Sequence, residues 1–202
     1  LEKIERDLGV QRQFVLAIWG RETAFGAHRS PHYAVQVLAT QAYAGRRKDM
    51  FRNELIHALK LLEDGTLTRE TMKSSWAGAM GLTQFMPSEY YTLAYDLDGD
   101  GRKDIWNSVP DALASAANQL RYRGWVPGKS WGYEVRLPPA VTCKSEGPPH
   151  ARPLRDWVNL GVTRTNASAF PEEILDAQAF ILTASGTYGP AFLVLENFMV
   201  IK

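Results

Sequence analysis

The pattern of apolar residues changes near Gly124, and this change restricts the chain to a few kinds of fold. Before Gly124, apolar side chains recur at the spacing of an amphipathic helix. After it, prolines from Pro127 to Pro153 separate short segments rich in Val, Tyr, Trp and Leu, which is typical of strands. We therefore expect an α+β fold, mainly α, with a helical domain over 1–125 and a small β-rich subdomain over 126–202.

Local signals predict where individual elements begin and end. We expect helices over about 1–8, 14–26, 48–63, 87–95 and 108–124. Gly9 is predicted to end the first helix, and Ser108 to be the N-cap of the last, with the acid Asp111 at its third position. The inward face of the third is predicted to carry Phe51, Leu55, Leu59 and Leu62. Strands are expected over 133–137, 157–160, 179–182 and 192–195. Because residues 191–202 read as a strand-like run with no closing element, we expect the subdomain to be truncated.

Composition excludes several classes of protein. The 202 residues suffice for one compact domain, or for one domain with a small appendage. Lys and Arg total 23 against 22 for Asp and Glu, a balance that argues against a nucleic-acid binder. No apolar run approaches the roughly 20 residues that a membrane helix needs. Cys143 is the single cysteine, so the chain forms no internal disulfide, which leaves the cellular compartment open.

Glu22 is the first candidate for chemistry. It follows Ile18 by four residues and Trp19 by three, so we expect it on their apolar helix face. The negative end of the helix dipole and desolvation beside Trp19 both favour a protonated carboxyl, as a general acid requires. The alternative is a structural ion pair with Arg21 or Arg29, and for Glu22 taken alone this alternative is favoured.

Residues 74–88 form the most distinctive stretch of the sequence. Ser75 and Gln84 offer hydrogen-bonding groups, and Met80 and Phe85 offer faces on which a sugar ring could stack. Small residues permit close approach of the backbone to a ligand or a helix: Ala77, Gly78, Ala79 and Gly81. This combination predicts a polysaccharide groove. The alternative is a tight helix-packing motif with Met80 and Phe85 in the core.

Three segments, 18–26, 75–88 and 118–125, resemble the lytic murein transglycosylase B family, and the similarity runs in order over 1–198. The resemblance implies a lysozyme-like helical fold and a periplasmic enzyme of Gram-negative bacteria. Such an enzyme is soluble or lipid-anchored through an N-terminus not present here. It would act as a monomer on peptidoglycan glycan strands, without a cofactor for catalysis. It would cleave the β-1,4 bond between N-acetylmuramic acid and N-acetylglucosamine and leave a 1,6-anhydro end.

The resemblance also implies roles for single residues. Glu22 would act first as acid and then as base, while the substrate's N-acetyl group assists. Ser75 matches a serine that orients this N-acetyl group, and Gln84 and Phe85 match groove-lining positions. Hydrolytic glycosidases normally need two carboxylates, and these motifs offer one, which favours the non-hydrolytic reaction.

Other positions leave alternatives open. Arg46 and Arg47 match an arginine pair that could hold the stem peptide or lactyl group, or they are solvated helix-end charges. Gln119 and Met50 stand where we expect aromatic residues in the groove, so glycan affinity is expected to be reduced. A muramidase-type hydrolase, which needs a second acid, and a peptidoglycan-binding scaffold with little turnover therefore remain alternatives.

Residues 96–107 resemble an EF-hand loop. The predicted ligands are Asp96, Asp98, Asp100, Arg102 through its carbonyl group, Asp104 and Asn107. Gly101 stands at the sharp-turn position, but Asn107 cannot supply the usual bidentate carboxylate of the twelfth position. We therefore expect weak, structural calcium binding, with sodium or water as alternative occupants. A metal-free acidic turn is the other interpretation.

Overall fold

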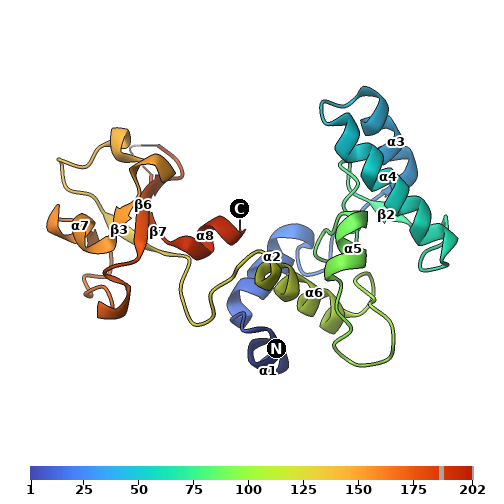
Figure 1. Ribbon diagram of the computed structural model, residues 1–202, viewed down its shortest axis with the longest axis horizontal. Helices are drawn as coiled ribbons and strands as arrows, with labels where there is room; N and C mark the ends of the chain where they lie inside the picture. Colours follow the sequence, from blue (N-terminus) through green and yellow to red (C-terminus); the bar gives the residue numbers. More distant parts are fainter. Residues whose placement is uncertain (187–188, 202) are drawn as a thin grey trace. The chain divides into compact units, whose positions relative to one another are not determined.

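The computed structural model describes residues 1–186 and 189–201. The chain divides into two compact units, Leu1–Arg123 and Gly124–Lys202, whereas the sequence predicted a boundary between 125 and 126. The first unit is mainly helical, and the second holds a small sheet (Figure 1). The predicted fold class, α+β and mainly α, is confirmed.

The helical unit contains six α-helices among its residues, all of which are described. They are α1 (Glu2–Leu8), α2 (Arg12–Thr23), α3 (Ala34–Ala44), α4 (Lys48–Glu63), α5 (Pro87–Leu93) and α6 (Val109–Tyr122). Two short strands, β1 (His32–Tyr33) and β2 (Lys73–Ser74), pair antiparallel. The sequence did not predict α3 or this strand pair.

Capping residues explain several boundaries. Gly9 adopts a left-handed conformation after α1, and its N–H donates to the carbonyl oxygen of Glu5. Ser108 is the N-cap of α6 and accepts a hydrogen bond from the backbone N–H of Asp111, as its pattern predicted. Helix α2 ends at Thr23, earlier than expected, because Ala24, Phe25 and Gly26 all have positive φ angles.

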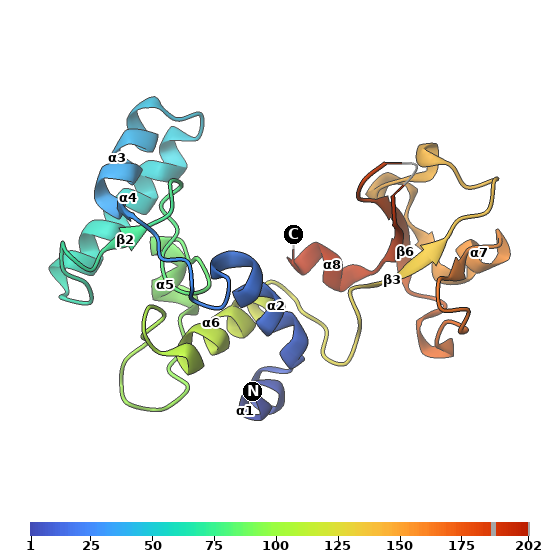
Figure 2. The same cartoon turned by 180° about the vertical axis from the view of Figure 1, so that it is seen from behind.

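Helices α3 and α4 lie side by side in both views (Figures 1 and 2). The predicted inward position of Leu59 is wrong, since its side chain is 48% exposed. Phe51 is buried as predicted, Leu55 and Leu62 are partly buried, and the other buried positions of α4 are Glu54, Ala58 and Leu61. Glu54 belongs to this face because its carboxylate accepts hydrogen bonds from the backbone N–H and the hydroxyl group of Ser88, at the start of α5.

The second unit is built on an antiparallel sheet with strand order β4-β6-β7-β3-β5. Its strands are β3 (Gly132–Arg136), β4 (Arg152–Pro153), β5 (Thr163–Arg164), β6 (Gln178–Thr183) and β7 (Ala191–Val194). Three 3₁₀ turns, η1 (Cys143–Ser145), η2 (Pro148–His150) and η3 (Glu172–Ile174), lie in the connections between the strands. The strands predicted over 133–137, 179–182 and 192–195 match β3, β6 and β7.

Two expectations for this unit are wrong. Residues Leu154–Asn159 form helix α7 rather than a strand, and the fully buried Trp157 donates its indole N–H to the carbonyl oxygen of Ala179. Residues Glu196–Ile201 form helix α8, so the predicted run without a closing element is a strand followed by a helix. Asn197 anchors α8 by exchanging two hydrogen bonds with the backbone of Val126.

Among the described residues, none of the helices is long and apolar enough to cross a membrane.

Replacing Gly78 with alanine tests how closely the distinctive loop packs on α3. Gly78 has a φ of +90°, and an added Cβ would lie 2.3 Å from Cδ2 of the fully buried Leu38. We expect Gly78→Ala to lower the free energy of unfolding by about 2–4 kcal/mol, through backbone strain and overpacking together. Chemical denaturation measures the change.

Gly65→Ala is the matched control, because Gly65 also has a positive φ, of +74°, but its added Cβ would meet nothing within 4 Å. It should cost about 1–2 kcal/mol from strain alone. Equal losses for the two variants would contradict the close packing of Gly78 against Leu38.

Candidate active site

Glu22 lies in the last turn of α2, and its side chain is exposed. The expected burial of its carboxyl beside Trp19 is wrong, because Val15 and Thr23 occupy the buried face of this helix. Within the described part of the chain, Glu22 makes no hydrogen bond or ion pair, so the alternative pairing with an arginine is absent there. The carboxylate is therefore open to a ligand.

The backbone after Glu22 turns back sharply on the helix. Ala24 and Phe25 have φ angles of 49° and 58°, a conformation that costs non-glycine residues roughly 1–2 kcal/mol each. The ring of Phe25 lies against Gly20, where an added Cβ would come within 2.8 Å of its Cζ. It also packs edge-on against Trp19, with ring centroids 5.4 Å apart. This hooked end keeps the Glu22 side chain at the surface.

Hydrogen bonds join the hooked end of α2 to the distinctive loop. The hydroxyl group of Thr23 donates to the carbonyl oxygen of Leu82 over 2.8 Å and accepts from the N–H of Gly26 over 3.2 Å. The N–H of Leu82 in turn donates to the carbonyl oxygen of Ile105 over 2.9 Å. The segment that carries Glu22 is thus fixed to the loop that carries Gln84.

The loop itself is closed by reciprocal backbone hydrogen bonds of 2.8 Å between Met80 and Phe85. Gln84 has a φ of 59°, and its side-chain N–H group donates to the carbonyl oxygen of Gly81 over 2.9 Å and to the hydroxyl group of Ser30 over 3.4 Å. The hydroxyl oxygen of Ser75 accepts the N–H of Ala79 over 3.2 Å. Both polar side chains are half-buried and held in one orientation.

Met80 and Phe85 have no exposed surface. Met80 packs in a cluster with residues of α3 and α4, and Phe85 packs with Leu93 and Ile105. The prediction that these two side chains offer faces to a sugar ring is wrong, because the chain uses them to hold the loop on the core. For these two residues the alternative, a packing motif, describes the structure.

The remaining predicted groove residues lie at the surface or form local hydrogen bonds. Arg46 and Arg47 are exposed in the connection between α3 and α4, and Met50 follows in the first turn of α4. On α6, the side-chain N–H group of Gln119 donates over 2.9 Å to the carboxylate of Glu89, which also pairs with Arg123. The roles of these residues toward a glycan stay predictions.

A cavity of about 340 Å³ adjoins the junction between α2 and the loop. Its walls include Thr23, Leu82 and Ser30, and also Glu70 from the segment before β2 and Lys73 from β2 itself. Sequence reasoning missed Glu70 and Lys73, because nothing in the pattern around them indicates that they return to this junction. Glu70 is an exposed carboxylate in the cavity wall.

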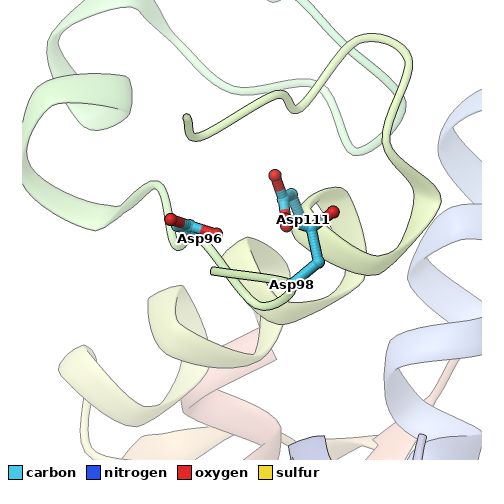
Figure 3. Close-up of side chains that lie close together, drawn as sticks. All are labelled: Asp96, Asp98 and Asp111. Carbon is cyan, nitrogen blue, oxygen red and sulfur yellow. The ribbon is translucent and has the colours of Figure 1, made fainter. Parts of the chain in front are cut away.

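The acidic loop gathers three carboxylates, and one of them was not predicted. Oxygen atoms of Asp96, Asp98 and Asp111 lie within 4.8 Å of one another (Figure 3). Asp111 is 1% exposed, and its two oxygens accept the N–H groups of Leu97 (2.9 Å) and Asp104 (3.0 Å). It lies beyond the twelfth loop position, so a strict EF-hand spacing overlooks it, although its place in the first turn of α6 was recognised.

The other predicted ligands make local contacts. Asp104 accepts the N–H groups of Trp106 and Asn107 over 3.0 and 2.9 Å, and the side-chain N–H group of Asn107 also points toward the Asp104 carboxylate. Asp100 accepts the N–H of Arg102 over 2.8 Å. Asp100, Arg102, Asp104 and Asn107 stay predictions as ligands.

The charges of this loop act on one another. Hydrogen bonds from the N–H groups of Gly99 and Gly101, the former the stronger influence, lower the pKa of Asp96. The N–H of Asp100 acts to lower the pKa of Asp98, but desolvation and the charge of Asp111 outweigh it, and the pKa of Asp98 is raised. A carboxylate in this position is stabilised by a proton or by a cation.

Comparison with known families decides the assignment of this chain. The Transglycosylase SLT domain family matches residues 1–202. The chain belongs to this family. A relative described as membrane-bound lytic murein transglycosylase B, from Escherichia coli strain K12, is 38% identical over 121 residues, which are 59% of this chain and 33% of that protein. The predicted family is thereby confirmed.

Solved structures of the family share the fold. A crystal structure of SltB3 from Pseudomonas aeruginosa in complex with NAG-NAM-pentapeptide has a TM-score of 0.91 and 42% identity, covering 99% of this chain and 54% of that one. The Escherichia coli lytic transglycosylase Slt35 in complex with calcium has a TM-score of 0.81 and 28% identity, covering 100% of this chain and 62% of that one. The predicted lysozyme-like transglycosylase fold is confirmed, and the chain spans about half the length of SltB3.

Thr23→Val tests the junction between α2 and the loop. Valine has nearly the same shape but leaves the carbonyl oxygen of Leu82 and the N–H of Gly26 without their partner. We expect the free energy of unfolding to fall by about 1–3 kcal/mol, the cost of buried unpaired polar groups. Thr92→Val is the control, since the Thr92 hydroxyl makes only an exposed bond within α5 and should change stability by less than about 0.5 kcal/mol. Equal losses in the free energy of unfolding for the two variants would contradict the role of Thr23 in joining α2 to the loop.

Proposed function

We propose that this chain is the catalytic part of a peptidoglycan lytic transglycosylase, with Glu22 as its acid and base. The observation that carries the proposal is the open carboxylate of Glu22, held at the hooked end of α2 and fixed to the loop with Ser75 and Gln84. Membership of the Transglycosylase SLT domain family supports it. The SltB3 complexes with NAG-NAM-pentapeptide and NAG-anhNAM-pentapeptide support the same substrate and product for this chain.

The reaction needs one carboxyl group used twice. Protonated Glu22 donates its proton to the glycosidic oxygen as the bond from C1 of N-acetylmuramic acid to that oxygen breaks. The carbonyl oxygen of the substrate's own N-acetyl group stabilises C1. Glu22, now a carboxylate, accepts the proton of the C6 hydroxyl group as that oxygen bonds to C1. The products are a strand ending in N-acetylglucosamine and a 1,6-anhydro end, and no water is consumed.

The exposed position of Glu22 suits this cycle. An unpaired carboxylate can accept and release the same proton without breaking an ion pair, and a glycan strand would exclude water from it on binding. We assign Ser75 to orienting the N-acetyl group and Gln84 to a hydrogen bond with the sugar, since both are already fixed by backbone contacts. Arg46 and Arg47 would attract the anionic stem peptide.

A hydrolase of the muramidase type is the second candidate, and Glu70 makes it testable. Hydrolysis needs a second carboxylate, and Glu70 lies in the wall of the cavity that Thr23 also lines. Under the transglycosylase proposal Glu70 has no chemical role. A binding scaffold with little turnover is the third candidate, because Gln119 and Met50 offer less stacking surface than aromatic residues.

We further propose that Asp96, Asp98 and Asp111 hold a structural calcium ion, because three hard oxygen ligands converge there. The Slt35 structure in complex with calcium supports this choice of ion. The ion would neutralise the repulsion around Asp98 and brace the connection between α5 and α6. It plays no part in the chemistry. Weak sites of this kind are typical of extracellular modules, which agrees with a periplasmic location in a Gram-negative bacterium.

Glu22→Gln tests the catalytic assignment. We expect release of soluble fragments from peptidoglycan sacculi to fall by about 10²–10⁴-fold, the range for loss of a general acid and base. Glu63→Gln, an exposed acid at the end of α4, is the control and should keep full activity. Glu70→Gln separates the candidates: unchanged release supports the transglycosylase, whereas loss of release by this variant, with reducing-end products from the parent chain, supports the hydrolase. Full activity of Glu22→Gln would overturn the proposal.

Calcium titration tests the metal site. Addition of calcium to chelator-treated protein should raise the free energy of unfolding by about 2.7 kcal/mol at a concentration one hundred times Kd. Asp98→Ala should abolish this gain while leaving the calcium-free protein folded, because its carboxylate is exposed. Asp49→Ala removes an exposed carboxylate of α4, outside the acidic loop, and as the control it should retain the gain. An unchanged melting temperature of the parent protein with calcium would contradict the site.

A further inference from the structure

A groove beside Ser75 has no part in the reaction described above. It has a volume of about 380 Å³ and lies between the segment of β1, one face of α3 and Trp76. The antiparallel pairing of β1 with β2, in which His32 lies opposite Ser74, holds one wall of the groove next to the loop. Because Trp76 follows Ser75 directly, the groove begins where the proposed catalytic residues end.

Trp76 is the most unusual feature of this groove. Its side chain is 73% exposed, although burying an indole ring is strongly favourable. Most large aromatic side chains of the helical unit are at least half-covered, so this exposure is not imposed by a shortage of core. An exposed tryptophan at the rim of a groove is characteristic of a surface that binds a ligand.

The walls of the groove carry neutral hydrogen-bonding groups. Gln36, Thr40 and Gln41 lie at helical spacing on one face of α3, and their side chains line the groove. No Asp, Glu, Lys or Arg residue is among the lining residues, all of which are described. A neutral ligand therefore fits better than a phosphate or a cation. An aromatic face beside carboxamide and hydroxyl groups matches an amino sugar, whose ring has an apolar face and whose edge carries hydroxyl and acetamido groups.

The same face of α3 continues away from Ser75. Tyr43 lies three residues after Thr40, one turn further along the helix, and its side chain is 84% exposed. Helix α3 has eleven residues, so this face extends over roughly 16 Å. A surface of this length can contact more than one sugar of an extended strand.

From this arrangement we infer that the groove is an outer glycan subsite, in which Trp76 stacks on an amino sugar remote from the bond that is cleaved. The inference rests on the proposed function, since it takes the same strand that Glu22 would cleave. Gln36 and Gln41 hydrogen-bond to the acetamido or hydroxyl groups of that sugar. The subsite offers stacking surface that Gln119 and Met50 do not. It would therefore help to hold a long strand although these two positions lack the aromatic residues expected there.

Binding of N-acetylglucosamine–N-acetylmuramic acid oligosaccharides tests the subsite. The measurements use the Glu22→Gln chain, which would bind the sugars without cleaving them, and compare a disaccharide with a hexasaccharide by calorimetry. We expect Trp76→Ala to weaken hexasaccharide binding about tenfold, which corresponds to roughly 1.4 kcal/mol, and to leave disaccharide binding unchanged. Trp76→Phe should retain most of the affinity, because the stacking ring is kept.

Controls make the test specific. Leu59→Ala removes another exposed apolar side chain, on α4 and outside the groove, and should not change affinity. Because Trp76 is exposed, none of these variants should change the melting temperature. A second experiment uses vesicles of phosphatidylglycerol, to test whether Trp76 binds a membrane surface instead. We expect the parent and Trp76→Ala to bind these vesicles equally.

Equal hexasaccharide affinity of the parent and Trp76→Ala would overturn the inference, as would vesicle binding that depends on Trp76. If the parent itself does not bind the hexasaccharide, the subsite is also excluded. The proposed function is decided separately, by the products that the Glu22-containing chain releases from sacculi. If the chain cleaves sacculi but Trp76→Ala does not change hexasaccharide affinity, only the subsite inference is contradicted, and the proposed function stands.

Discussion

The hydrogen bond from Thr23 to the carbonyl oxygen of Leu82 is the contact on which the candidate site depends. It joins a helix end to a loop separated from it by 59 positions in the sequence. It adds a long-range contact to the capping hydrogen bonds of Ala24 and the packing of Phe25 on Trp19, which together hold this left-handed backbone. With it, Glu22 stays exposed at a fixed place, and Gln84 is held on the same structural unit. Catalysis by a single carboxylate requires this fixed geometry, since no second acid would help to position the substrate.

The core beneath the loop explains why the motif is so rich in small and apolar residues. Gly78 lies against Leu38, Gly81 lies against the carbonyl group of Ile105, and Met80 and Phe85 fill two buried clusters. The loop thus serves two purposes along one short segment. Its apolar residues hold it on the core, and its polar residues Ser75 and Gln84 are the ones that we propose bind a ligand. Trp76 belongs to the second group, because it points away from the core beside a groove with neutral polar walls.

The sequence predicted the features that depend on local patterns. The N-cap at Ser108, the left-handed Gly9 and the full extent of α4 all follow from residues close together in the chain. The predictions failed where contacts between residues distant in the sequence determine the structure. Apolar spacing alone placed Leu59 inward on α4, but the hydrogen bonds from Ser88 draw Glu54 to the buried face instead. Trp157 was expected in a strand because of its residue type, whereas its bond to Ala179 holds it in a helix.

The same distinction applies to the candidate site. Family resemblance predicts the roles of Glu22, Ser75 and Gln84, but it could not show that Glu22 lacks a partner among the described residues. Asp111 was recognised as a capping residue, and only the fold brings it to Asp96 and Asp98.

The most direct test of the central claim is digestion of sacculi in water enriched in ¹⁸O, followed by mass spectrometry of the fragments. A single-carboxylate transglycosylase transfers the substrate's own C6 oxygen to C1. We therefore predict 1,6-anhydro ends that contain no ¹⁸O. Reducing ends that carry one ¹⁸O atom would show that water attacks C1 and would contradict the account.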